Sequence, residues 1–185
     1  TTILLYQNKK PSKKVSEKNK TNPYENNYIF SKHLLEEVVN FYKDRIPSII
    51  VRLSNIYGYS KLKRPDLVPT LMQKVFTKQK IYVWNNKPVR DFIFAEDAAD
   101  VIVKLLNSKF TGVVNVGSGK SSSVKKLTDI ISKYSNKKIE ALNKRVTGPY
   151  KFITNINLLK KVTKWKPKYS LEKGLLKTYN IMKNY

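Results

Sequence analysis

The sequence predicts an α/β fold, because segments with strand character alternate along the chain with segments of helical periodicity. Residues 48–53 (Ser-Ile-Ile-Val-Arg-Leu) are an apolar, β-branched run that is typical of a buried parallel strand. Residues 25–45, which precede this run, carry apolar side chains at helical spacing, and Pro47 ends the helix. Residues 113–116 (Val-Val-Asn-Val) predict another strand further along. This alternation is typical of α/β proteins.

The remaining elements are predicted from the same two patterns. Residues 3–6 could be the end of a buried strand, and 7–22 is a polar, lysine-rich stretch that predicts a loop. Asp66 is placed to cap one helix, and the serines at 121–123 are placed to cap another. Further strands are expected at 81–84, 89–94 and 137–142, and further helices at 66–78, 96–106, 121–134, 155–163 and 171–184.

The composition argues against several classes of protein. At 185 residues and 41% hydrophobic content, the chain can bury a real core. It has no cysteine and a single histidine, His33, so we expect no disulfide framework, no metal site and no Ser-His-Asp triad. No apolar run approaches the ~20 residues that span a bilayer, and residues 1–6 lack the features of a signal peptide. We therefore expect a globular, cytoplasmic protein without membrane contact.

The net charge of +24 raises the question of nucleic-acid binding. The lysines are scattered along the whole chain, and no zinc-finger, zipper or RNA-recognition signature accompanies them. A lysine-rich composition bias on solvated faces explains this charge better than a dedicated nucleic-acid site, which stays open as an alternative. Such a field would still attract an anionic substrate.

Tyr28 and Lys32 are the candidate catalytic pair. Four residues apart on a predicted helix, they lie one above the other on the same face. A lysine ammonium beside a phenol favours the phenolate, so the tyrosine could exchange a proton during a reaction. The pair alone is a weak signal, because a chain with 12 tyrosines and 37 lysines and arginines contains this spacing by chance.

Glycine motifs for phosphate binding are incomplete or missing. Gly117-Ser-Gly-Lys-Ser121 has the tail of a P-loop, but Val114 stands where that motif needs a glycine. We interpret the segment as a strand-to-helix turn in which the glycines relax the backbone. No Gly-x-Gly-x-x-Gly occurs, and the first glycine of the chain is Gly58, whereas a complete dinucleotide-binding domain opens with such a turn.

Five ordered blocks around the pair resemble the extended short-chain dehydrogenases/reductases, in the NAD-dependent epimerase/dehydratase family that acts on nucleotide sugars. Residues 22–32 resemble the family's Pro-Tyr-x-x-Ser-Lys region around the active tyrosine. Residues 52–58 (Arg-Leu-Ser-Asn-Ile-Tyr-Gly) resemble its Arg-x-x-Asn-x-Tyr-Gly strand end, and 89–97 resemble its Arg-Asp-aromatic block. Residues 114–119 and 165–167 (Trp-Lys-Pro) are two further landmarks, so the match covers nearly the whole chain.

The resemblance implies the distal half of a Rossmann-type parallel sheet with an interleaved, smaller α/β substrate-binding domain. The N-terminal glycine-rich half of the family fold is absent from the sequence. Residues 1–60 would be the distal part of the NAD-binding domain. Residues 61–185 would be mainly the nucleotide-sugar-binding region, with 111–134 returning to the Rossmann sheet. The implied cofactor is NAD or NADP.

The resemblance also assigns catalytic and cofactor-binding residues. Tyr28 would remove the proton of a sugar hydroxyl, and Lys32 would favour the phenolate and hydrogen-bond the nicotinamide ribose. Thr2, four residues before the tyrosine of a turn that resembles the family's Val-Tyr-Gly, would hydrogen-bond the substrate oxygen. Leu53 and Ser54, at the carboxyl end of a strand, would approach the nicotinamide.

The implied substrate is a nucleotide sugar. Asn55 matches a family position that contacts it, and Arg90 matches a diphosphate-binding arginine. Arg145 matches a second such arginine in a block that is less complete. No nucleic-acid partner is expected.

The resemblance implies hydride transfer at a sugar carbon, and the residues after Thr2 narrow the reaction. Family dehydratases place an Asp-Glu pair there, whereas this chain has Ile3 and Leu4. Without that acid/base pair we expect an epimerase or a 4-ketoreductase. The alternatives are a dehydratase of the same family, a catalytically inactive binding member and a basic nucleic-acid-binding protein.

A homodimer is a further expectation, because family members often pair through the helix that carries the tyrosine. The apolar positions of helix 25–45 would serve that interface or the core of the domain itself. These positions are Tyr28, Leu34, Leu35, Val38, Val39 and Tyr42.

Overall fold

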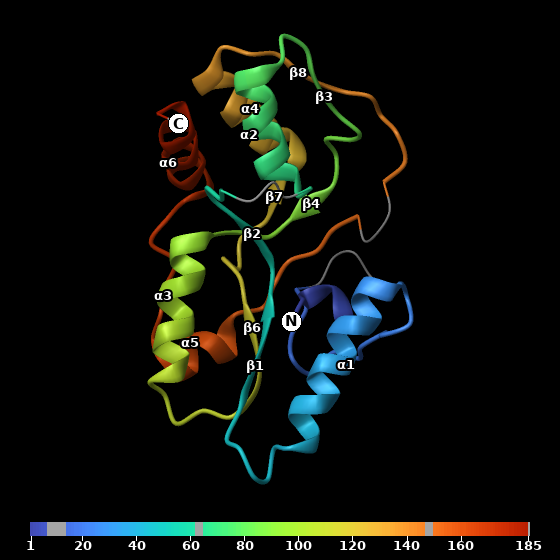
Figure 1. The fold of residues 1–185 in the computed structure, drawn as a ribbon, viewed down its shortest axis with the longest axis vertical. Helices are drawn as coiled ribbons and strands as arrows, with labels where there is room; N and C mark the ends of the chain where they lie inside the picture. The colour runs from blue at the N-terminus through green and yellow to red at the C-terminus, as the bar shows by residue number, and fades with distance from the viewer. Residues whose placement is uncertain (7–13, 62–64, 147–149, 185) are drawn as a thin grey trace.

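The computed structural model describes residues 1–6, 14–61, 65–146 and 150–184, and its elements form two groups along the long axis of the molecule (Figure 1). The lower group contains β1 (Ile49–Leu53), β6 (Gly112–Val116), α1 (Asn27–Phe41), α3 (Ala95–Leu106) and α5 (Asn157–Thr163). The upper group contains α2 (Leu67–Thr77), β3 (Ile81–Val83), α4 (Val124–Ser135), β8 (Ile139–Ala141) and α6 (Leu171–Lys183). The short strands β2 (Asn55–Tyr57), β4 (Val89–Arg90), β5 (Phe92–Phe94) and β7 (Ser122–Ser123) lie between them.

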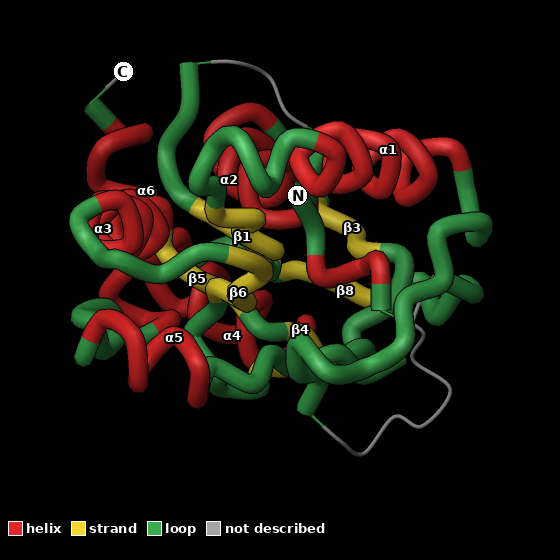
Figure 2. The backbone as a smooth tube through the Cα atoms, turned by 90° about the horizontal axis from the view of Figure 1, so that it is seen from below, coloured by secondary structure: helices red, strands yellow, loops and turns green. Residues whose placement is uncertain are grey.

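Parallel strand pairs form the centre of the described chain. β1 pairs with β6, β2 with β5 and β3 with β8, all in parallel, whereas β4 and β7 are antiparallel. Seen from below, α1 lies on one face of β1 and β6 and α5 lies on the opposite face (Figure 2). Val114 and Val116 on one face of β6 and Asn115 on the other are fully buried, as expected for a strand covered on both faces. These pairs confirm the predicted α/β class.

Each group has its own apolar core. In the lower group, Val101 of α3 and Leu159 of α5 pack with the valines of β6. In the upper group, Met72, Leu127 and Leu175 bring α2, α4 and α6 together. α6 approaches β2 closely at Gly174, because a Cβ there would collide with the Tyr57 hydroxyl. This close contact joins the upper helices to the strand that continues from β1.

Most predicted elements are present, with ends within four residues of the expected ones. Ser123 caps α4 by accepting a hydrogen bond from the Lys126 amide at 3.0 Å, as predicted. Asp66 lies at the cap position of α2 but makes no capping bond with its side chain. The expected strand at 89–94 divides into β4 and β5 at Asp91. The Asp91 carboxylate accepts a hydrogen bond from the amide of Ser118 in the loop after β6.

The strand expected at 3–6 is wrong, because residues Ile3–Leu5 form the short 3-10 helix η1. The Thr2 hydroxyl accepts a hydrogen bond from the Leu4 amide at 3.2 Å, which starts this helix. Thr2 bridges Leu53 in parallel before this helix, and Tyr6 forms an isolated antiparallel bridge with Thr21 after it. The expected loop at 7–22 includes 7–13, which lie outside the described residues.

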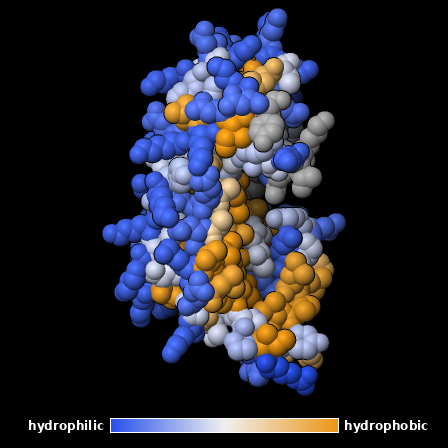
Figure 3. Space-filling model, turned by 60° about the vertical axis from the view of Figure 1, so that its left-hand side comes forward, coloured by the Kyte–Doolittle hydropathy of each residue, from blue (hydrophilic) through white to orange (hydrophobic). Residues whose placement is uncertain are grey.

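Most apolar positions of α1 do not serve the core of the domain. The helix begins at Asn27, capped by Asn26, and buries only Ile29 and Glu36. The side chains of Leu35 and Val38 are 54% and 58% exposed. Hydrophobic side chains gather on the lower part of the molecule, where α1 and β1 lie (Figure 3). No described helix, α1 included, has the length and apolar content needed to cross a membrane.

Candidate active site

Tyr28 and Lys32 lie on the first turns of α1, as the spacing predicts. The Lys32 ammonium is 5.5 Å from the centre of the Tyr28 ring, so the two side chains are neighbours on one face. Tyr28 is 54% exposed, which leaves its hydroxyl open to an incoming molecule. The helical spacing alone brings this pair together, and the rest of the fold decides what it faces.

A buried ion pair fixes α1 against the sheet. The Arg52 Nε donates to Glu36 Oε1 at 3.0 Å, and its Nη2 donates to Oε2 at 2.6 Å. The guanidinium also lies over the Tyr6 ring, 4.7 Å from its centre. Glu36 is one turn beyond Lys32, and Arg52 directly precedes Leu53 of β1. This pair therefore ties the helix of the catalytic pair to the strand that leads into the site.

The ion pair perturbs the titration of its members. Burial disfavours the charged form of Glu36, but hydrogen bonds from Arg52 and Thr1 outweigh it and lower the pKa of Glu36. Burial likewise acts against the charged form of Arg52, and the bond to Glu36 raises the pKa of Arg52. Burial raises the pKa of the Tyr6 phenol, which donates to Asn115 Oδ1 at 2.8 Å. Both charges of the pair are thus held ionised inside the fold.

Sequence reasoning missed the role of Glu36 and Arg52. The available signals were a charged residue inside the buried run 48–53 and a carboxylate one turn after Lys32. A buried strand rarely carries an arginine without a partner. These signals indicate that each residue needs a partner, and the fold shows that the two pair with each other.

Thr2, Leu53 and Ser54 meet at the carboxyl end of β1. Thr2 bridges Leu53, and the Ser54 amide donates to the Val116 carbonyl at 2.9 Å. The Ser54 Oγ is buried and has no hydrogen-bond partner among the described residues. A buried hydroxyl without a partner is unusual, and ligands of open α/β sheets bind at this end of the strands. The three predicted positions therefore lie together at a place suited to a ligand.

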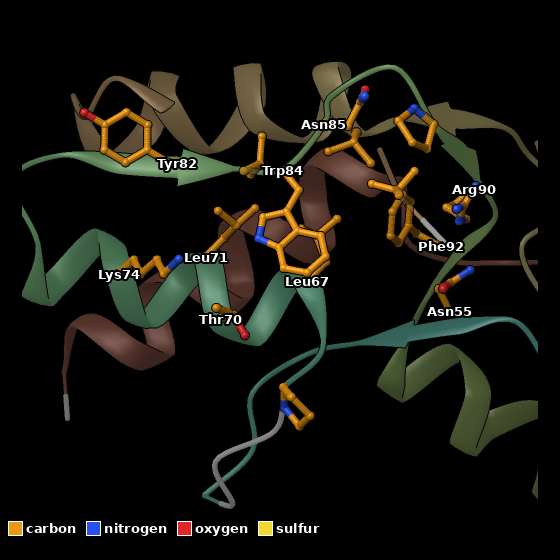
Figure 4. Close-up of a pocket in the computed structure, with 15 residues that line it drawn as sticks. Asn55, Leu67, Thr70, Leu71, Lys74, Tyr82, Trp84, Asn85, Arg90 and Phe92 are labelled. Atoms are coloured by element: carbon orange, nitrogen blue, oxygen red, sulfur yellow. The ribbon is translucent and has the colours of Figure 1, made fainter. Parts of the chain in front are cut away.

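A second part of the site is a cavity of about 430 Å³ between β3 and α2 (Figure 4). Asn55 and Arg90, both predicted to bind substrate, line it. Arg145 is exposed and does not line the cavity, although its neighbour Val146 does. Residues 147 and 148 of the Arg145 block lie outside the described residues. The fold thus brings together two of the three predicted substrate residues.

Backbone carbonyls of the described residues bind only one nitrogen of the Arg90 guanidinium. Its Nη1 donates to the carbonyls of Val89 at 3.0 Å and Tyr150 at 3.1 Å. No described acidic residue pairs with it, and burial lowers the pKa of its guanidinium. A partly buried arginine with unused donors is suited to an anionic ligand with several oxygens.

The turn at 117–119 binds a carboxylate of the chain itself. Asp91 is fully buried and accepts hydrogen bonds from the Ser118 amide at 2.8 Å and the Ser118 hydroxyl at 2.6 Å. It also accepts from the amides of Gly119 at 3.0 Å and Thr154 at 3.2 Å. A Cβ at Gly117 would lie 2.7 Å from Asp91 Oδ2, so glycine is needed there. We call this arrangement the Asp91 latch.

The Asp91 latch explains why the sequence of this turn resembles part of a phosphate-binding loop. Its backbone donors are arranged for an anion, and the carboxylate of Asp91 already occupies them. Burial raises the pKa of Asp91, and the hydrogen bonds from Ser118 and Thr154 act against this rise. The interpretation of this segment as a strand-to-helix turn therefore agrees with the geometry.

A second buried carboxylate, that of Asp97, binds the segment that follows the Trp-Lys-Pro block. Asp97 accepts hydrogen bonds from the amides of Lys168 at 2.9 Å and Tyr169 at 3.0 Å. The neighbouring Asp100 accepts from the indole of Trp165 at 2.8 Å. The block at 89–97 thus joins distant segments through Asp91 and Asp97.

Comparison with known proteins places the chain in a family. A family model described as "NAD dependent epimerase/dehydratase family" matches residues 2–117, more than half of the chain. The chain belongs to this family. Its members are enzymes, and the resemblance inferred from the five blocks is confirmed.

Individual relatives act on different nucleotide sugars. The chain is 28% identical over 168 residues to a CDP-abequose synthase of Salmonella muenchen, which covers 85% of this chain and 57% of the relative. It is 32% identical over 139 residues to a GDP-L-fucose synthase of Sinorhizobium fredii, covering 68% and 44%. The chain spans about half the length of the curated relatives it matches.

A solved structure agrees with the fold. The UDP-glucuronic acid 4-epimerase of Bacillus cereus, in complex with UDP-glucuronic acid and NAD, superposes with a TM-score of 0.87 at 25% identity. The match covers 100% of this chain and 60% of the epimerase. This confirms a partial Rossmann-type fold of the short-chain dehydrogenase/reductase class.

Proposed function

We propose that this chain carries the catalytic pair and the substrate-binding region of an NAD- or NADP-dependent nucleotide-sugar epimerase or 4-ketoreductase. The observation that carries the proposal is the continuity of the two parts of the site. β1 ends at Leu53 beside Thr2, and the next residues lead directly to Asn55 on the wall of the cavity. One stretch of chain thus connects the catalytic part with the anion-binding part.

In this proposal Tyr28 exchanges the proton of the sugar hydroxyl, with Lys32 stabilising the phenolate. Thr2 accepts a hydrogen bond from the Leu4 amide, so its own hydroxyl hydrogen is left to donate to the same oxygen. The buried, unpartnered Ser54 hydroxyl fits a polar group of the cofactor next to Leu53. The nicotinamide, when bound, supplies the hydride acceptor or donor for a sugar carbon.

The substrate end would use Arg90 and Asn55. The unused guanidinium donors of Arg90 suit the oxygens of a diphosphate. Asn55 donates from Nδ2 to the Asp91 carbonyl at 3.1 Å, which leaves its amide oxygen to accept from a sugar hydroxyl. Arg145 would act as a second diphosphate ligand only if it turns inward on binding.

The two residues after Thr2 favour an epimerase or ketoreductase over a dehydratase. Ile3 is buried and Leu4 is half-buried, so no carboxylate stands there to eliminate water.

The test is product analysis by mass spectrometry. The chain, or the longer protein if its reading frame extends upstream, is incubated with NAD or NADP and UDP-, GDP- and CDP-sugars. We expect an epimer or a reduced 4-hydroxy product that Tyr28→Phe abolishes while cofactor binding persists. Release of a 4-keto-6-deoxy sugar would identify a dehydratase, and binding without turnover would identify an inactive member. Unchanged turnover in Tyr28→Phe would remove Tyr28 from the mechanism.

We also propose that α1 pairs with α1 of a second copy. Leu34, Leu35, Val38 and Phe41 present an exposed apolar face, which a specific interface of about 800 Å² per partner could bury. Sedimentation should give a dimer that Val38→Glu converts to a monomer. Val103→Glu, at an equally exposed position on α3, is the matched control. A monomeric wild type would contradict the proposal.

A further inference from the structure

Asp91 directly follows Arg90, and its side chain and main chain together bind three separate segments. The carboxylate accepts from the turn at 117–119 and from the Thr154 amide, as described for the Asp91 latch. The Asp91 carbonyl accepts two hydrogen bonds from Asn55, one from the backbone amide at 3.1 Å and one from Nδ2 at 3.1 Å. One buried residue thus connects β2, the turn after β6 and the segment around Thr154.

The segment that contains Thr154 also holds the side chain of Arg90. The Val89 amide donates to the Tyr150 carbonyl at 2.9 Å, and the same carbonyl accepts from Arg90 Nη1 at 3.1 Å. Thr154 lies four residues after Tyr150 and donates its amide to the Asp91 carboxylate at 3.2 Å. The hydrogen bond to Asp91 therefore fixes one end of the segment whose other end orients the Arg90 guanidinium.

Arg90 and Asn55 line the same end of the cavity. In Figure 4 both lie on one side of Trp84, and Lys74 lies on the other. Asp91 is fully buried and does not line the cavity, nor do the residues that bind its carboxylate. Asp91 can therefore act on a ligand in the cavity only through its neighbours Arg90 and Asn55.

We propose that Asp91 is a positioning residue for the anion site, because its carboxylate holds the segments that aim the Arg90 guanidinium at the cavity. This rests on the proposed function, because it takes Arg90 as the ligand of the diphosphate. The fork of guanidinium donors binds two oxygens at once only in a fixed orientation. Loosening the Asp91 latch should therefore weaken anion binding without removing any group that touches the anion.

Calorimetric titration with pyrophosphate tests this, since pyrophosphate offers diphosphate oxygens without a base or a sugar. Arg90→Ala should weaken its binding about 10- to 150-fold, the range for hydrogen bonds to a charged group. Asp91→Asn keeps Arg90 and should weaken binding by about twofold or more, as expected for residues that share one hydrogen-bonded network. Its loss should not exceed that of Arg90→Ala.

A double variant separates positioning from a general effect on the fold. In the Arg90→Ala background, Asp91→Asn should change pyrophosphate affinity by less than about twofold, because the group that Asp91 positions is already gone. Ser118→Ala removes one donor of the latch and keeps the carboxylate, so it should weaken binding by a smaller factor, and it replaces Asp91→Asn if that variant does not fold.

Val101→Ala is the matched control for loss of stability. Val101 is fully buried in the core of the lower group, so its truncation should lower the midpoint of urea unfolding. Pyrophosphate affinity should stay within about twofold of wild type, because the site is distant and shares no partner with Arg90. All titrations are made in the absence of urea.

The outcomes separate this proposal from the proposed function. If Arg90→Ala weakens pyrophosphate binding but neither Asp91→Asn nor Ser118→Ala does, the positioning role is wrong and the substrate site stands. An equal effect of Asp91→Asn with and without Arg90 would also overturn the positioning role, because Asp91 would then act through another group. If Arg90→Ala binds pyrophosphate as tightly as the wild type, or the wild type does not bind it, both proposals fail.

Discussion

Replacement of the carboxylate in the Asp91 latch should destabilise the chain strongly. Asp91→Asn has nearly the same shape as the wild type, so it creates neither a cavity nor a clash. It does change one acceptor oxygen into an NH2 donor. The change therefore tests the hydrogen bonds of the latch and little else.

The magnitude is set by the four donors that converge on Asp91. One oxygen accepts from the amide and hydroxyl of Ser118, and the other accepts from the amides of Gly119 and Thr154. If the NH2 group faces Ser118, the Ser118 amide loses its acceptor, whereas the Ser118 hydroxyl can turn and accept from the NH2 group. If it faces the other way, the amides of Gly119 and Thr154 lose theirs. At least one donor is therefore left unpaired at a cost of about 1–3 kcal/mol, and the free energy of unfolding should fall by at least that amount. A typical domain has only about 5–15 kcal/mol in total.

Urea unfolding followed by circular dichroism measures this loss. Asp44→Asn, an exposed aspartate on the turn after α1, is the matched control and should change the free energy of unfolding by less than about 0.5 kcal/mol. A loss below about 1 kcal/mol in Asp91→Asn would refute the reasoning, because it would mean that the buried donors find other acceptors.

Three further predictions concern the interior. Glu36→Gln should lower the free energy of unfolding by about 3–5 kcal/mol, because it leaves the buried Arg52 without a charged partner, whereas the neighbouring Glu37→Gln should have little effect. Since the pKa of Glu36 is lowered in the fold, its contribution should be fully present above its ordinary pKa of 4.5 and be lost as the pH falls below it. Denaturant curves from pH 3 to 7, in roughly half-unit steps, would show the wild type and Glu36→Gln converging in acid, and parallel curves would contradict this. Gly117→Ala should lower the free energy of unfolding by about 1–3 kcal/mol, because its Cβ would press on the Asp91 carboxylate, and a melting temperature equal to wild type would rule this out.

Local pattern was enough to predict most elements of the fold. The β-branched run at 49–53 and the helical spacing of α2 to α6 appear in the structure with small changes at their ends. The prediction was wrong where a polar side chain competed with the backbone pattern. The Thr2 hydroxyl capped a 3-10 helix in place of the expected strand end.

The exposed face of α1 shows the limit of periodicity. Apolar spacing predicts which side chains share a face, but it does not say whether another element covers that face. Leu35 and Val38 share a face as predicted, yet no described element covers it. Only the arrangement of the other helices could decide this.

The α/β class and the pairing of Tyr28 with Lys32 follow from the sequence, because both depend on local periodicity along single segments. The sequence also contains the blocks by which the family is recognised. The tertiary structure alone decided that Asp91 fills the turn at 117–119 and that Arg52 holds Glu36. It also decided that Trp84 shares a cavity with Arg90. These contacts join residues far apart in the sequence or on different elements, and chain packing rather than local conformation brings them together.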